Sequence, residues 1–103
     1  MRERKTRTQL RLPVDLVQHI DELRGDLTRT EVVKETLRQL LYDMQHDMFP
    51  NAFLAMLREL TWTRTERQRI DMRLPTQYLE YLRLNQYNIT QCIITALRLY
   101  RLP

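Results

Sequence analysis

The tripeptide Arg-Leu-Pro stands at positions 11–13 and 73–75 of this chain of 103 residues. Each copy ends a run in which polar and apolar residues alternate, as in Thr8-Gln9-Leu10-Arg11-Leu12. Alternation of this kind predicts a half-buried β-strand. When the chain is shifted on itself by 62 positions, both runs superpose and the match continues without a gap to Leu40 and Leu102. We therefore interpret the chain as an internal duplication.

Each copy predicts a strand, a helix, a turn and a second helix. Pro13 ends strand pairing and suits the first turn of a helix. Gly25 is expected to end that helix in the left-handed conformation. Thr28 is expected to cap the second helix, with Glu31 completing a capping box, and the matching position in the second copy is Thr90. Because a lone short strand leaves its backbone groups unpaired, we expect the two strands to pair antiparallel within one chain.

This organisation predicts a mainly α-helical fold with a short two-stranded antiparallel β-ribbon. We expect three segments: a first motif over 1–44, a connecting segment with a short helix over 45–66, and a second motif over 67–103. The 50–60 helix either packs on the core of its own chain or contacts a neighbouring molecule, and Trp62 beside it is expected in the core or at a hinge. The expected apolar face of the strands and of each first helix comprises Leu10, Leu12, Ile70, Met72, Leu74, Leu16, Val17, Ile20, Leu23, Tyr78, Leu79 and Leu82. The expected apolar face of the second helices comprises Val32, Val33, Leu37, Leu40, Leu41, Met44, Met48, Ile94, Leu97 and Leu99.

The positive charge is concentrated at the two predicted strands. Residues 1–11 contain five basic groups and one acidic group, and residues 64–73 contain four basic and two acidic groups, although the whole chain is only +4. Arg outnumbers Lys fifteen to two, and the Arg guanidinium suits bidentate contacts with phosphate or guanine. A basic tail can also be incidental, but basic residues at matching places in both copies favour an anionic partner.

The segments Arg7-Thr8-Gln9-Leu10-Arg11-Leu12-Pro13 and Leu27-Thr28-Arg29-Thr30 resemble the ribbon-helix-helix (Arc/MetJ-type) DNA-binding superfamily. The match to its rarer tandem, single-chain form covers 5–44 and 67–102. The resemblance implies that the outward strand residues contact base edges and that each second helix presents its N-terminus to a phosphate. The implied base-contacting residues are Arg7, Gln9, Arg11, Arg69, Asp71 and Arg73. The implied phosphate-binding residues are Thr28, Arg29, Thr30, Thr90, Gln91 and Lys5.

The sequence departs from this pattern at two places. Asp71 places a carboxylate where the field of DNA is most negative, and three roles are open to it: accepting a hydrogen bond from cytosine N4, pairing with Arg69 or Arg73, or weakening binding on its side. Gln91 followed by Cys92 is a poorer phosphate clamp than the corresponding residues of the first copy.

The sequence thus predicts a sequence-specific binder of double-stranded DNA, most simply a transcriptional repressor whose ribbon enters the major groove. An accessory factor for conjugative DNA processing (a relaxosome factor) or an antitoxin would use the same fold, and a helical protein-interaction adaptor is the alternative of another class. We expect a monomeric pseudo-dimer, able to associate side by side on DNA, whose unequal central residues favour an imperfectly palindromic site.

We expect no enzymatic activity, cofactor or metal, because no nucleophile–base set or phosphate loop is visible and His19, His46 and one cysteine do not make a zinc site. No apolar run approaches the roughly 18 residues of a membrane span, and no apolar stretch follows the basic start as in a secretory signal. A cytoplasmic protein is therefore expected.

Overall fold

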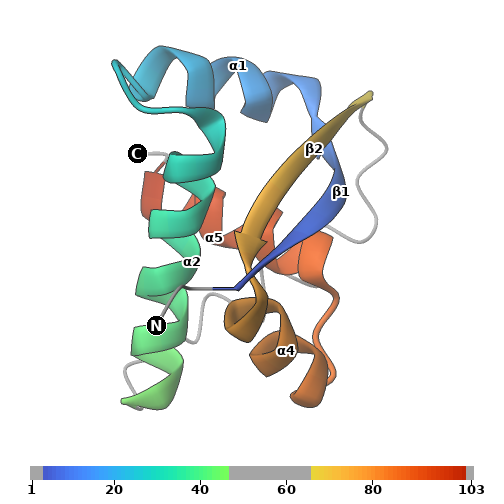
Figure 1. Cartoon of the computed structure of the whole chain (residues 1–103). Helices are drawn as coiled ribbons and strands as arrows, with labels where there is room; N and C mark the ends of the chain where they lie inside the picture. The colour runs from blue at the N-terminus through green and yellow to red at the C-terminus, as the bar shows by residue number, and fades with distance from the viewer. Residues whose placement is uncertain (1–3, 47–65, 102–103) are drawn as a thin grey trace.

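The structure, a computed structural model, describes residues 4–46 and 66–101. Within these ranges the elements follow in the order β1 (Lys5–Pro13), α1 (Val14–Leu23), α2 (Arg29–Gln45), β2 (Arg67–Pro75), α4 (Thr76–Leu84) and α5 (Ile89–Arg101) (Figure 1). The described fold is mainly helical with one two-stranded antiparallel sheet, which confirms the predicted fold class at this level. None of the described helices is long and apolar enough to cross a membrane.

The two strands pair with each other within the chain, and we call this two-stranded sheet the ribbon. The central register pair is Gln9 opposite Asp71. The backbone N–H of Val14 donates to the carbonyl of Glu66 at 3.1 Å, and that of Thr76 donates to the carbonyl of Arg4 at 2.9 Å. These two bonds continue the pairing past each proline, so that both ends of the ribbon are fastened in the same way.

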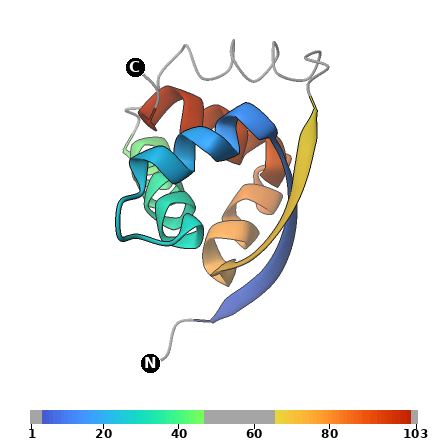
Figure 2. The ribbon, with the colours of Figure 1, turned by 90° about the horizontal axis from the view of Figure 1, so that it is seen from above.

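All described helices lie on one side of the ribbon (Figure 2). The inward strand side chains are buried as predicted, and α2 and α5 pack against each other beneath them. Each of these two helices also contacts the strand of the other copy, α2 with β2 and α5 with β1. Burial of apolar surface therefore joins the two copies into one core. The buried strand residues are Leu10, Leu12, Ile70, Met72 and Leu74.

Four residues predicted in the core are less buried than expected, among them Met44 and Tyr78, which are only partly buried. Leu23 is 54% exposed because α1 ends at this residue, beyond the edge of the packed helices. Leu99 is only partly buried, whereas Leu97 on α5 is fully buried. Met48, the predicted 50–60 helix and Trp62 lie outside the described residues.

The expectation that Thr90 caps the second helix of the second copy is wrong. The cap is Asn88, whose Oδ1 accepts a hydrogen bond from the Gln91 N–H at 3.0 Å. Thr28 does the same in the first copy, where its Oγ1 accepts from the Glu31 N–H at 3.1 Å. The two caps lie 60 positions apart, whereas the two strands and the starts of the two first helices keep the spacing of 62. The gapless alignment therefore fails at the turn, and the second copy is shorter there by two residues.

The backbone of the turn locates the missing residues. Gly25 has φ +56° and Gln86 has φ +64°, so both follow their helix in the left-handed conformation. These positions are 61 residues apart, between the spacing of 62 at the helix starts and the spacing of 60 at the caps. The second copy therefore lacks one residue before its left-handed position and one residue after it. Leu23 and Leu84 accordingly correspond, and both are exposed at the end of the first helix of their copy.

Candidate nucleic-acid interface

One face of the ribbon points away from the helices (Figure 2). The residues exposed on this face are polar and mainly cationic. From Lys5 to Arg11 and from Arg67 to Arg73, every second residue is exposed on this side, and all six predicted base-contacting residues are among them. We call this surface the outer face; it consists of Lys5, Arg7, Gln9, Arg11, Arg67, Arg69, Asp71 and Arg73. Six of these eight side chains are cationic and one is anionic, so the outer face is strongly positive.

The strand register places like charges opposite each other on the outer face. Arg7 is the register partner of Arg73, and Arg11 is the register partner of Arg69. Directly opposed like charges destabilise an antiparallel sheet. The free protein therefore retains two repulsive pairs on this face.

Asp71 at the centre of the ribbon relieves part of this repulsion. Its Oδ2 accepts a hydrogen bond from Arg7 Nη2 at 3.2 Å across the ribbon, and its Oδ1 lies 3.8 Å from Arg69 Nε. Of the pairings expected for this carboxylate, the one with Arg69 is present, whereas Arg7 takes the place expected for Arg73. Within residues 4–46 and 66–101, Arg11 and Arg73 have no acidic partner.

Two shallow hollows join the outer face to the beginnings of α2 and α5. In the first, Thr30 of α2 lies beside three cations, Lys5, Arg7 and Arg73, and the carboxylate of Asp71. In the second, α5 and its cap contribute Asn88, Thr90 and Gln91, and the ribbon contributes Gln9, Arg11, Arg67 and Arg69. Each second helix thus begins beside a different end of the outer face.

Both helices present unpaired backbone donors at these beginnings. The N–H groups of Arg29 and Thr30 in α2, and those of Ile89 and Thr90 in α5, make no hydrogen bond within the described residues. Unpaired N–H groups and the helix dipole make such a terminus a site for anions. The cations of the adjoining hollow reinforce this preference.

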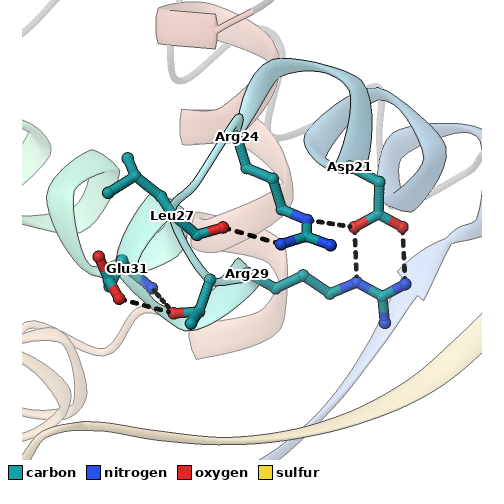
Figure 3. A network of polar contacts seen from close by, with 6 residues as sticks. Asp21, Arg24, Leu27, Arg29 and Glu31 are labelled. Atoms are coloured by element: carbon teal, nitrogen blue, oxygen red, sulfur yellow. Dashed lines mark hydrogen bonds and ion pairs between the residues drawn. The ribbon is translucent and has the colours of Figure 1, made fainter.

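The Arg29 side chain, predicted to bind phosphate, is engaged within the protein instead (Figure 3). Its Nε and Nη2 donate to the two carboxylate oxygens of Asp21 at 2.7 and 2.6 Å. Arg24 donates to the same carboxylate at 3.2 Å and to the Leu27 carbonyl at 2.9 Å. The hydrogen bonds from Arg29, with its charge, hold the pKa of Asp21 below its ordinary value. This network fastens α1 to the beginning of α2.

Thr28 is also engaged within the protein. Its hydroxyl accepts from the Glu31 N–H, as predicted for the cap. The Glu31 carboxylate accepts from the same hydroxyl at 3.2 Å, whereas the predicted capping box would have it accept from the Thr28 backbone N–H. The start of α2 therefore offers a ligand its backbone N–H groups and the Thr30 side chain, because the side chains of Thr28 and Arg29 are already paired. In the second copy, the predicted Thr90 and Gln91 both line the hollow.

No protein-family model matches this sequence, and no match was found among curated proteins or among solved structures. The interface is therefore assigned from its own geometry.

Two residues of this interface escaped the sequence prediction. Arg67 extends the outer face by one further alternation, which the period of two in β2 would have indicated. Asn88 is a residue type that often caps helices, but the gapless alignment pointed two positions further along the chain.

Two further observations concern metal ligands and the cysteine thiol among the described residues. No group of three or more His, Cys, Asp or Glu side chains in 4–46 and 66–101 is placed to hold a metal ion. Cys92 is fully buried, and burial raises the pKa of its thiol to about 12. A buried, protonated thiol is a poor nucleophile.

Proposed function

We propose that this protein is a sequence-specific double-stranded DNA-binding protein that acts as a transcriptional repressor. In this proposal the ribbon enters the major groove with its outer face toward the base pairs. The observation that carries the proposal is the outer face itself, where six cations surround one carboxylate on a two-stranded ribbon whose other side is buried. The major groove of B-DNA is wide enough for such a ribbon.

Electrostatics supports an anionic partner for this surface. The opposed arginines, Arg7 with Arg73 and Arg11 with Arg69, repel each other in the free protein. Close to DNA their charges are favourable, because each neutralises phosphate charge and releases bound counterions. Arginine also makes bidentate contacts with O6 and N7 of guanine, which gives the same residues a means of distinguishing base pairs.

The helix starts at the two hollows would hold the protein in a fixed position on the duplex. Backbone N–H groups at Thr30 and Thr90 lie beside opposite ends of the outer face and would meet phosphates flanking the groove. Such contacts orient a protein on DNA without carrying sequence information. Base contacts from the ribbon and phosphate contacts from the helices together make up the proposed interface.

The resemblance to tandem ribbon-helix-helix proteins supports the same function. We interpret 1–44 and 67–103 as two such motifs forming a pseudo-dimer within one chain. On this interpretation a monomer occupies one site, and longer operators bind two molecules side by side. A cytoplasmic location follows from this function.

The proposal is tested by selecting bound sequences from random duplex DNA and measuring the affinity of the selected duplex by fluorescence anisotropy. The logarithm of the binding constant should fall linearly with the logarithm of salt concentration, with a slope on the order of −5 for this number of cations. Replacing Arg11 with Ala should weaken binding by about 1–3 kcal/mol and relax the preference at particular base pairs.

The matched control is Arg38→Ala, which removes an exposed arginine of α2 outside the outer face. This variant should bind like the wild type. If Arg11→Ala and Arg38→Ala have the same small effect, the ribbon is not the contact surface. If no duplex is bound at moderate salt, or if binding ignores salt, the chain belongs with protein-interaction adaptors.

A further inference from the structure

The ion pairs of Asp71 divide the four central arginines of the outer face into two classes. Asp71 takes one member of each opposed pair: Arg7 from the pair with Arg73, and Arg69 from the pair with Arg11. We call Arg7 and Arg69 the held arginines and Arg11 and Arg73 the free arginines. In each of the two opposed pairs, one arginine is held and its register partner is free.

This division follows the symmetry of the ribbon. In an antiparallel pair, a two-fold relation through Gln9 and Asp71 exchanges residues that are 62 positions apart. It exchanges Arg7 with Arg69 and Arg11 with Arg73. One carboxylate thus holds one symmetric set of arginines and leaves the other symmetric set free, although the central residues themselves differ.

We propose that Asp71 determines specificity by withdrawing the held arginines from base contact, so that the free arginines Arg11 and Arg73 are the guanine-contacting residues. This inference rests on the proposed DNA-binding function and names the chemistry that the site recognises. The groove is lined at guanine by acceptors, which suit a guanidinium and repel a carboxylate. An Asp71 left without its arginines in a dehydrated groove would be an unpaired charge, which is strongly unfavourable. Arg7 and Arg69 therefore stay with Asp71 when DNA binds.

The register sets the spacing of the recognised bases. Arg11 and Arg73 lie on opposite strands. Arg73 faces Arg7, which precedes Arg11 by four residues along β1, so the two free arginines are four register positions apart. Four residues of an antiparallel strand extend about 14 Å, which corresponds to roughly four base-pair steps of 3.4 Å. The selected site should carry two guanines about four steps apart on opposite DNA strands. The imperfection of the palindrome is then confined to its centre, under Gln9 and Asp71.

The test compares the selected duplex with an unrelated duplex of equal length and composition, at several salt concentrations, using Asp71→Asn. Release of the held arginines should strengthen binding to the unrelated duplex and lower the ratio of the two affinities by about tenfold. Removal of one negative charge should steepen the salt dependence by about one unit of slope. The control Glu80→Gln removes an exposed carboxylate of α4 outside both hollows and should leave the affinity ratio unchanged.

Single alanine variants test the two classes directly, because all four arginines are exposed and their removal should not disturb the core. Arg11→Ala and Arg73→Ala should each abolish the preference for one guanine, whereas Arg7→Ala and Arg69→Ala should leave both preferences in place. If the held and free variants relax base preference alike, or if Asp71→Asn keeps the wild-type affinity ratio, the inference fails while sequence-specific binding stands. A wild-type protein that prefers no duplex would overturn the proposed function and this inference with it.

Discussion

The left-handed backbone at Gln86 predicts that replacing this residue with Gly stabilises the protein. A residue with a Cβ loses about 1–2 kcal/mol in this conformation, and φ at Gln86 is +64°. The extra freedom that Gly gives the unfolded chain offsets about 0.4–1 kcal/mol of the gain. The net increase in the free energy of unfolding should be about 0.5–1 kcal/mol, or roughly 2–8 °C in melting temperature.

The opposite change in the first copy completes the comparison. Gly25→Ala should lower the free energy of unfolding by about 1 kcal/mol through backbone strain alone, because an added Cβ at Gly25 would meet no atom within 4 Å. The control is Gln18→Gly, the same substitution at an exposed position inside α1. There it should destabilise by about 0.5–1 kcal/mol. Urea denaturation followed by circular dichroism measures all three, and equal signs for Gln86→Gly and Gln18→Gly would refute the reasoning.

Three further predictions concern the second helices and the turn that precedes α2. Asp21→Asn should destabilise by about 1 kcal/mol at pH 7. Because Arg29 lowers the pKa of Asp21 in the folded state, the difference in unfolding free energy from the wild type should persist above the ordinary value of 3.8 and vanish as the pH falls through the lower folded pKa. Asn88→Ala should destabilise by about 1 kcal/mol in thermal melts and Thr90→Ala by much less; the reverse order would restore the gapless alignment. Cys92 should resist iodoacetamide in the native protein and react in denaturant, and rapid native labelling would contradict its burial.

The parts of the fold that the sequence predicts are those set by short-range periodicity. The alternation around Leu10 and Met72 located both strands and their buried faces, because a period of two fixes which side chains face the helices. The two prolines fixed the start of each first helix for an equally local reason. The pairing of β1 with β2 followed from the need of each strand for a partner.

The failures arise where several spacings satisfy the same pattern. The apolar run of α5 is nearly continuous, so Ile94 and Leu99 match the first copy at a shift of 62 and Ile93 and Leu97 match it at 60. The cap at Asn88 and the full burial of Leu97, which then matches the fully buried Leu37, distinguish the two alignments. The sequence pattern also could not predict which surface side chains pair with each other, because this depends on register, rotamer and competition among neighbours. For this reason the engagement of Arg29 by Asp21 was missed.

The closure of the ribbon within one chain has a kinetic and a quantitative consequence. A ribbon shared by two chains forms in a bimolecular step, and its concentration varies with the square of the monomer concentration when protein is scarce. Here Val14 bonds to Glu66 and Thr76 to Arg4 inside a single molecule, so the ribbon forms in a first-order process. Its abundance rises in direct proportion to the amount of protein synthesised. In the proposed monomer, binding to the outer face then has no concentration threshold set by assembly.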